Sequence, residues 1–555
     1  MDRRDFIKTA GLAGSALALS GATGALPSDA GAAQGIRPNI ILIMVDDMGY
    51  SDLGCFGSEI ETPNIDRLAA GGIKFTQFYN CSRCCPTRAS LLTVLYPHQA
   101  GIGHMTGPDF DYRGDGYNGR LNDGCVTIPE VLRETGYRTY MSGKWHLGER
   151  EGELPVDRGF EDYFGILKGV EHYFRPRKLL RNREQIEPWE GFYTTDAFTD
   201  HAIERIRENH NEGNKPYFLY LAYNAPHYPL QAKPEDIEKY KKRYIDGWDR
   251  LRAERYGKMV ETGIIDGKWA LSERDREVPS WDKVPRVLRE RMAQKMAVYA
   301  AMVDSVDQNI GRLLEAVKLT GQMGNTLILF LSDNGACSER GPWGFNNHVI
   351  QGGFDKKDGP LGSAKSFASY GRSWSNASNT PFRLHKHWTH EGGIATPLIA
   401  HWPSVIKNPG AVDRRRGHVI DIMSTCLGVA GASYPTSRRG IEITPMEGKS
   451  IAPAFEDKPR DEHEIIAWEH EGNRALRRGK WKIVSKHPHK WELYDLEADR
   501  TELNNLAKIE RPRVEKMAGA YKEWARRCGV KRWNPVNNYL PWVKEAVRDI
   551  VENGF

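Results

Sequence analysis

Short, almost wholly apolar runs alternate along the chain with stretches whose apolar residues recur at helical spacing. The apolar runs at residues 39–45, 217–221, 326–331 and 396–401 have the composition of strands buried on both faces of a parallel sheet. Residues 292–319 predict a long helix with one apolar face. Strands that alternate with helices predict an α/β fold with a large, doubly wound and mostly parallel sheet flanked by helices.

Two of the intervening helices have clear start and stop signals. Thr62 followed by Pro63 predicts the start of one helix, which Gly71 ends. Thr127 and Glu130 have the spacing of a capping box, in which each side chain caps the backbone amide of the other residue. They predict the start of a second helix.

The C-terminal part of the chain has a different pattern. Short apolar runs with tight connections precede an amphipathic stretch, at residues 464–469, 474–477, 480–485, 492–496 and 513–527. We predict a smaller antiparallel α+β domain at residues 456–555, after a main α/β domain at residues 36–455. Two polar insertions, at residues 231–289 and 341–379, are expected to wall a pocket.

The first 33 residues have the layout of a twin-arginine export signal. Arg3 and Arg4 precede an apolar run at residues 10–19 and small residues up to position 33. An amphipathic helix is the weaker alternative, because no acidic face accompanies the apolar one. We expect the twin-arginine export machinery as a partner and a periplasmic or secreted protein. No cysteine follows the apolar run and no later stretch is apolar enough to span a bilayer, so a stable membrane anchor is not expected.

The overall composition limits the possible partners. The 555 residues include 78 Lys and Arg against 73 Asp and Glu, a formal net charge of +5. Because this charge is nearly balanced, neither nucleic acid nor an anionic membrane surface is expected as a partner. The eight cysteines form no repeating framework, so disulfides are possible after export but not required.

Four oxygen-bearing side chains follow two of the predicted strands directly. Asp46 and Asp47 come after the run at 39–45, and Asp333 and Asn334 after the run at 326–331. Taken singly, each pair would be a solvated strand end or a turn. Ligands of open α/β sheets bind beyond the carboxyl ends of the strands, and four such donors suit Ca²⁺ or Mg²⁺ and not zinc.

The cysteine-rich segment at residues 81–93 has three interpretations. Cys81 and Cys84 form a Cys-x-x-Cys pair, which can be redox-active or half of a zinc site, but no second pair completes a zinc knuckle. The thiols could also simply pack near a helix start. In the third interpretation, Cys84, Pro86 and Arg88 belong to a modification signal.

That third pattern resembles the signal of type I sulfatases, in the alkaline phosphatase superfamily, which is Cys-x-Pro-x-Arg followed by Leu-Thr. Cys84, Pro86 and Arg88 fill the fixed positions, and Leu92 and Thr93 the trailing pair. The resemblance implies that a maturation enzyme, a further partner, oxidises Cys84 to formylglycine, whose hydrated aldehyde is the nucleophile. Two positions depart from the family pattern, Thr87 for Ser or Ala and Val94 for Gly.

A hydrated aldehyde is suited to sulfate transfer. One of its hydroxyls attacks sulfur and the other later collapses to the aldehyde and expels sulfate. Pro86 suits the first turn of a helix, which would place Cys84 at the helix N-terminus, where backbone amides favour an anion. Arg88 can hold the alkoxide or a sulfate oxygen by charge-assisted hydrogen bonds.

Further motifs follow in the order found in sulfatases. The hexapeptide at residues 143–148 contains Lys144 and His146, a tetrapeptide ends in His227, and Lys386 lies in a stretch at 379–403 that resembles the arylsulfatase-like branch. The resemblance assigns sulfate binding to Lys144, release of sulfate to His146, and help for the departing alcohol to His227 and Lys386.

The same resemblance completes the predicted site. It assigns one metal ion, usually calcium, to Asp46, Asp47, Asp333 and Asn334. We predict in addition that Mg²⁺ is possible, that modified Cys84 is a further ligand, and that Asp333 accepts the proton of the nucleophile.

We therefore predict a sulfuric ester hydrolase that acts on aryl or carbohydrate sulfates, in small molecules or glycans, through a covalent sulfo-enzyme. A phosphoesterase or phosphonate monoester hydrolase of the same superfamily is one alternative. A non-catalytic protein that binds sulfated glycans is another.

Overall fold

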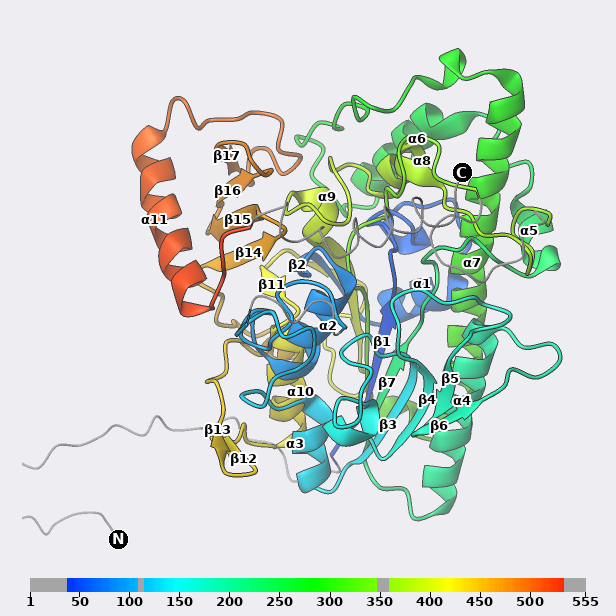
Figure 1. Cartoon of the computed structure of the whole chain (residues 1–555), viewed down its shortest axis with the longest axis vertical. Coiled ribbons are helices and arrows are strands. Elements are labelled where there is room, and N and C mark those ends of the chain that lie inside the picture. The colour runs from blue at the N-terminus through cyan, green and yellow to red at the C-terminus, as the bar shows by residue number, and fades with distance from the viewer. Residues whose placement is uncertain (1–36, 108–113, 347–358, 534–555) are drawn as a thin grey trace, which may run out of the picture. The chain divides into compact units, whose positions relative to one another are not determined.

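The computed structural model describes residues 37–107, 114–346 and 359–533. Among these residues the main sheet has eleven strands in the order β10-β2-β9-β8-β1-β7-β3-β4-β5-β6, with β11 also paired to β2 (Figure 1). The strands are β1 Asn39–Val45, β2 Ile73–Tyr79, β3 Arg138–Lys144, β4 Asp162–Ile166, β5 Leu179–Arg181, β6 Glu184–Ile186, β7 Tyr217–Ala222, β8 Thr326–Ser332, β9 Ala395–His401, β10 Ala411–Asp413 and β11 Gly417–His418.

Most central strands of this sheet are parallel, and one is not. β1 runs parallel to β7 and β8, and β3 parallel to β4 and β7. β9 runs antiparallel to both of its neighbours, β2 and β8. The expectation of a parallel strand at residues 396–401 was therefore wrong. The apolar composition of this run indicates that both faces of the strand are buried, but it does not determine the direction of the strand.

Helices cover both faces of the sheet, because alternate residues of each strand point to opposite sides. Ile41 and Ile43 of β1 pack in one apolar cluster with helices α1, α4 and α7, whereas Ile40 and Leu42 pack in a second cluster with α2, α3 and α10 (Figure 1). These helices are α1 Pro63–Ala70, α2 Cys84–Thr93, α3 Ile128–Glu134, α4 Thr194–Asn211, α7 Arg286–Leu319 and α10 Asp421–Ala430. The doubly wound fold is confirmed, as is the capping box of Thr127 and Glu130.

The two insertions carry helices of their own: α5 Pro234–Tyr240, α6 Gly247–Glu261 and α8 Gly371–Ser378. Their tryptophans mostly serve the core. The Trp248 ring packs edge-on against Trp281 and Trp374, with ring centroids 4.6 and 5.4 Å apart. All three are buried, so they stabilise the insertions and are not available to a substrate.

The C-terminal part contains an antiparallel sheet, as expected, of strands β14 Ile466–His470, β15 Asn473–Arg478, β16 Trp481–Ser485 and β17 Glu492–Asp495, followed by α11 Arg511–Arg527. A two-stranded hairpin, β12 Ser437–Arg438 and β13 Ile441–Glu442, precedes it. Trp468 and Val484 pack into the first core cluster of the main sheet, and Leu476 and Ile483 pack with Trp524 of α11. The domain boundary at residue 456 stays a prediction.

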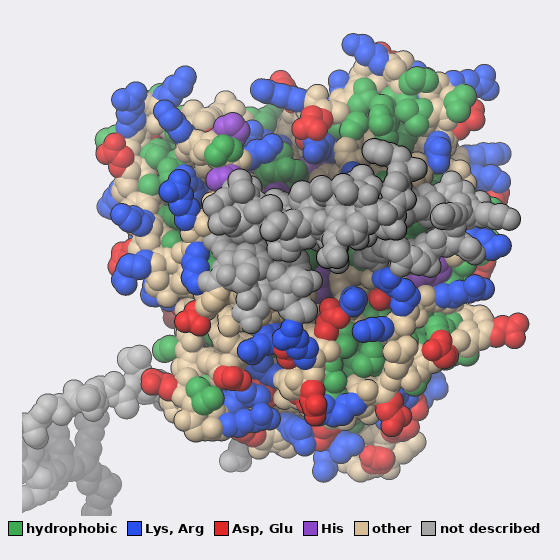
Figure 2. Space-filling view, in the orientation of Figure 1, with side chains coloured by type: hydrophobic (Ala, Val, Ile, Leu, Met, Phe, Trp, Pro, Cys, Tyr) green, Lys and Arg blue, Asp and Glu red, His purple; other side chains and the backbone are tan. Residues whose placement is uncertain are grey.

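The proposed export signal at residues 1–33 lies outside the described residues. No helix within the described ranges is long and apolar enough to cross a membrane. Lysine and arginine side chains alternate with acidic ones over the face shown in Figure 2, in keeping with the balanced net charge.

Candidate active site

The four predicted oxygen donors meet because their strands are neighbours in register. Val45 of β1 pairs with Ser332 of β8, so Asp46 and Asp47 emerge beside Asp333 and Asn334. The Asp47 amide donates to Asp333 Oδ1 at 3.3 Å, and Asn334 Nδ2 donates to Asp47 Oδ1 at 2.6 Å. All four residues are at most 1% exposed.

Three oxygens of this group have no hydrogen-bond partner although they are buried: Asp46 Oδ1, Asp47 Oδ2 and Asn334 Oδ1. Buried polar atoms without partners are costly, and they are rare unless an ion or a ligand satisfies them. Burial, followed by the Asp46 carboxylate, raises the pKa of Asp333 well above its ordinary value, although Arg88 opposes this. A cation among these oxygens would favour the ionised form, so the residues fit a hard divalent metal ion.

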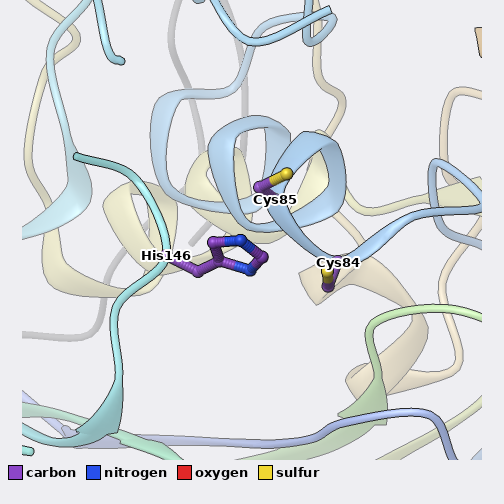
Figure 3. Close-up of side chains that lie close together, drawn as sticks. All are labelled: Cys84, Cys85 and His146. Carbon is purple, nitrogen blue, oxygen red and sulfur yellow. The ribbon is translucent and has the colours of Figure 1, made fainter. Parts of the chain in front are cut away.

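Cys84 is the first residue of helix α2. Arg83 before it is extended, and Pro86 lies in the first turn, where its missing N–H is harmless. Figure 3 shows the imidazole of His146 next to Cys84, with Cys84 and Cys85 pointing in different directions. A hydrogen bond from Cys85 lowers the pKa of the Cys84 thiol well below its usual range; burial opposes this, and Lys144 supports it.

The Cys-x-x-Cys pair does not act as a unit. All eight cysteines lie within the described ranges and none forms a disulfide. Cys81 Sγ donates to Ser90 Oγ at 3.4 Å, and Cys85 Sγ lies 3.4 Å from the His104 carbonyl oxygen. Cys84, Cys85 and His146 do bring potential metal-ligand atoms within 4.8 Å of one another, but Cys81 has no part in this group.

Arg88 and Lys144 bind the carboxylates of the oxygen donors. Arg88 donates from Nε and Nη2 to Asp333 Oδ2, at 3.1 and 2.8 Å, and from Nη1 to the Lys144 carbonyl at 2.9 Å. Lys144 Nζ forms an ion pair with Asp46 and donates to the Gly169 carbonyl at 2.7 Å. Burial would raise the pKa of Asp46, but Lys144, followed by His227 and Arg88, lowers it to about 2.

His227 and Lys386 lie on the other side, around Asp47. Lys386 Nζ donates to Asp47 Oδ1 at 2.6 Å, and His227 Nε2 lies 3.4 Å from Asp47 Oδ2. His227 Nδ1 lies 2.6 Å from the Tyr228 carbonyl and must donate to it, because a carbonyl oxygen only accepts. Burial would lower the pKa of Lys386, but Asp47 raises it well above its ordinary value, so this side chain stays charged.

The structure thus brings together all ten residues that the sequence predicted for the site, and none is more than 4% exposed. Their individual chemical roles stay predictions.

Sequence reasoning missed three neighbours of the site. Gly169 accepts from Lys144 and leaves room for the His146 ring. Arg83 pairs with Glu339 at 3.5 Å beside Cys84. Glu339 and Gly169 lie in loops without a motif, so no local signal points to them. Arg83 lies between Cys81 and Cys84, directly before the family pattern begins.

The comparisons with known proteins agree with this geometry. Residues 38–432 match the family model described as sulfatase, and residues 382–524 match that of the N-sulphoglucosamine sulphohydrolase C-terminal region. An uncharacterized sulfatase of Schizosaccharomyces pombe is 36% identical over 509 residues, which cover 86% of this chain and 91% of that protein. The arylsulfatase of Klebsiella aerogenes is 35% identical over 441 residues, covering 77% and 94%.

Among solved structures, the complex of Ps i-CgsB with k-i-k-neocarrahexaose superposes with a TM-score of 0.65 and 27% identity, covering 91% of this chain and 97% of that one. The chain belongs to the sulfatase family. More specifically, it is a type I sulfatase of the alkaline phosphatase superfamily, an enzyme that hydrolyses sulfuric esters; the family generally uses a metal ion and formylglycine. The predicted fold class and reaction class are confirmed.

Proposed function

We propose that Cys84 is oxidised to formylglycine and that this residue, with the nine other residues of the site, cleaves aryl or carbohydrate sulfates. One observation carries the proposal. Cys84 lies at the N-terminus of α2, next to His146 and to a group of buried oxygens without partners. The hydrated aldehyde would supply one hydroxyl to attack sulfur and a second to expel sulfate afterwards.

We further propose that the ion at Asp46, Asp47, Asp333 and Asn334 is Ca²⁺, with Mg²⁺ as the alternative and modified Cys84 as a further ligand. The donors are all oxygens, and several are held in a fixed cluster by hydrogen bonds within it. When bound, the ion would bind a sulfate oxygen and lower the free energy of the charge that develops there.

The remaining roles follow from position. Asp333 would accept the proton of the attacking hydroxyl, while Arg88, held at three points, binds the resulting oxygen. Lys144 would neutralise the transferring sulfuryl group. His146 would take the proton of the second hydroxyl, because burial lowers its pKa to about 4 and leaves the ring neutral, with a lone pair, at pH 7.

The alcohol would depart beside Lys386 and His227. Attack forms the new oxygen–sulfur bond, and the bond from sulfur to the ester oxygen breaks, so the alcohol oxygen needs a proton. In neutral His227, donation from Nδ1 to Tyr228 leaves Nε2 without a proton. Lys386 is then the group that carries a proton for the alcohol, and His227 donates only when it is itself protonated.

The substrate class is a sulfated small molecule or glycan. Support comes from the relatives, among which are arylsulfatases, an N-acetylgalactosamine-6-sulfatase of the rat, and a neighbour solved with a neocarrahexaose. We also propose that a formylglycine-generating maturase acts on Cys84, and that the twin-arginine pathway exports the chain to the periplasm or beyond. The Arg3 and Arg4 pair and the apolar run after it support the export route.

Peptide mass spectrometry across Asn80 to Arg88, on protein made with its maturase, tests the proposal. We expect an aldehyde or its hydrate in place of the Cys84 thiol, and loss of turnover without loss of fold in Cys84→Ala. Cys81→Ala, three residues away, should keep most of the activity. Full activity of Cys84→Ala would refute the assignment, as would an aldehyde-bearing, calcium-loaded enzyme that cleaves no sulfate ester.

A further inference from the structure

The loop that carries Lys386 has a backbone that only surrounding contacts can hold. Leu384 and His387, on either side of Lys386, have φ angles of 65° and 90°. Left-handed backbone at non-glycine residues costs free energy, and it persists where neighbouring structure fixes it. The contacts that fix this loop come from the main domain and from the C-terminal sheet.

Glu492 on β17 holds the loop at both ends. Its Oε2 accepts from Arg383 Nη2 at 2.6 Å and lies 3.3 Å from His390 Nε2. The Tyr494 hydroxyl donates to the same oxygen at 2.7 Å and orients the carboxylate. One side chain of the C-terminal sheet therefore connects the residues that precede and follow Lys386.

A buried group of charges holds the end of the loop. Lys482 of β16 and Arg500 donate to Glu391 at 2.9 and 3.1 Å, and the Glu391 amide donates to Glu502 at 3.0 Å. Lys482 also pairs with Glu502 at 2.8 Å. All four side chains are fully buried. Buried charges tolerate little displacement, because each one depends on its partner for compensation.

The middle of the loop is held by the turn between β14 and β15. Asn473 Oδ1 accepts from the His487 amide at 3.1 Å, so its Nδ2 faces His387 Nε2, at 3.2 Å, and donates to it. The proton of His387 is then on Nδ1, which lies 3.1 Å from Glu471 and donates to it. His387, His470 and Glu471 are close enough to hold a metal ion. However, His387 Nδ1 carries the proton and therefore has no lone pair for a metal ion. The contact is a hydrogen bond that fixes the loop.

The main domain holds the loop as well: the His387 amide donates to the Ser82 carbonyl at 2.8 Å, Asn379 Nδ2 donates to the Leu384 carbonyl at 3.0 Å, and His385 Nδ1 lies 2.7 Å from Ser375 Oγ. The Lys386 amide donates to the Ala336 carbonyl at 3.1 Å, and Nζ donates to Asp47 at 2.6 Å. We propose that the C-terminal sheet is a positioning element of the active site, which sets the place of Lys386 Nζ through Glu492, Glu391 and the Asn473 turn. This inference rests on the proposed function, in which Lys386 serves the departing alcohol.

The dependence on the leaving group tests the inference. A good leaving group such as 4-nitrophenolate departs with little help, whereas phenolate from phenyl sulfate is the poorer one and needs more. In Glu492→Gln, kcat/KM should fall about tenfold or more for phenyl sulfate and about twofold or less for 4-nitrophenyl sulfate. The side chain of Glu492 is 27% exposed, so the variant should fold.

Asp495→Asn is the matched control. Asp495 lies on the same strand, and its carboxylate pairs with Lys480 at 2.7 Å and not with the loop. Both substrates should be cleaved as by the wild type. Glu391→Gln is a second test variant, which keeps the shape of the side chain and should show the same preferential loss as Glu492→Gln, with the melting temperature recorded for each protein.

Lys386→Ala separates the two levels of the proposal. It should lower kcat/KM for phenyl sulfate by about 100-fold or more, and much less for 4-nitrophenyl sulfate. Equal losses on both substrates in Lys386→Ala would remove its role in the proposed function. A preferential loss in Lys386→Ala, together with equal or no losses in Glu492→Gln and Glu391→Gln, would overturn the positioning role alone.

Discussion

Gly169 lies directly against the imidazole ring of His146: a β-carbon on this glycine would stand 2.6 Å from Cε1 and 2.8 Å from Nε2. The carbonyl of the same residue accepts a hydrogen bond from Lys144. One small residue thus fixes the distance between two groups to which we assign the binding and the release of sulfate. Its backbone must stay close to both, which no larger side chain permits.

Gly169→Ala should therefore displace His146. We expect kcat to fall about 100-fold, because a shift of about 1 Å at a reacting group has effects of this size. The melting temperature, measured alongside, distinguishes a displaced ring from a loss of fold. Gly519→Ala in α11 is the control. Its new β-carbon meets nothing within 4 Å, so activity should be kept and stability should rise by about 0.5–1 kcal/mol. Wild-type turnover by Gly169→Ala would contradict the role of the glycine.

Removing one unpaired oxygen should weaken the metal site. After treatment with a chelator, the wild type should gain about 2.7 kcal/mol of stability when Ca²⁺ is added to 100 times its dissociation constant. Asn334→Ala lacks one of the three buried oxygens without partners, so its calorimetric melting curve should shift only at higher Ca²⁺. Asn408→Ala, which removes an exposed hydrogen bond to Asp457, should respond like the wild type. Identical titrations for Asn334→Ala and the wild type would exclude Asn334 as a ligand.

Arg88→Lys should be damaging although it keeps the charge. Lysine cannot donate to Asp333 and to the Lys144 carbonyl at the same time in the planar geometry that the guanidinium provides. We expect kcat to fall at least about 100-fold and the free energy of unfolding to fall by about 3 kcal/mol, because a buried charge loses part of its compensation. The control is Arg250→Lys, since Arg250 forms an exposed ion pair with Asp246. This substitution should change the free energy of unfolding by less than about 0.5 kcal/mol. Urea unfolding and steady-state rates check both, and an active Arg88→Lys would disprove this account.

His418 should make the protein sensitive to acid. Burial lowers its pKa from 6.5 to about 3. The Ile420 amide donates to His418 Nδ1 at 3.4 Å, so protonation of this nitrogen would break the hydrogen bond. Because the pKa is lower in the folded state, this contribution to stability is complete above pH 6.5 and is lost as the pH falls toward 3, by up to about 1.4 kcal/mol per pH unit.

Urea unfolding of His418→Gln between pH 7 and pH 4 should therefore show a weaker dependence on pH than unfolding of the wild type. His489→Gln, at an exposed position, should follow the wild type. Parallel curves for His418→Gln and the wild type would show that His418 is not protonated on unfolding.

The sequence predicted those features that depend on local chemistry. The capping box of Thr127, the helix start at Cys84 and the strand ends at Asp46 and Asp333 were all recognisable, because each is defined by residues a few positions apart. The departure at Val94 also has a local explanation. Val94 ends α2 with φ of 66°, a left-handed conformation in which glycine carries no penalty, which explains why the family most often has glycine there.

Other features depend on contacts between distant segments and could not be predicted from the sequence. The direction of β9 is set by which strands it joins, and its apolar residues are the same for either direction. The hydrogen bond between Glu492 and Arg383 joins residues 109 positions apart in the sequence, and that between Asn473 and His387 joins residues 86 positions apart. No sequence pattern within either segment predicts such a partner.

Because β9 runs antiparallel, insertions before this strand and insertions after it should have different consequences. Since β9 runs against β8, the residues before it arrive at the edge where Asp333 emerges, while those after it, such as Ser404, meet the opposite edge near Gly324. Extra residues placed after β9 would extend away from the chemistry and cost little. Residues added before it would reshape the entrance for the substrate, so that related chains with new specificities should vary in length mainly ahead of this strand.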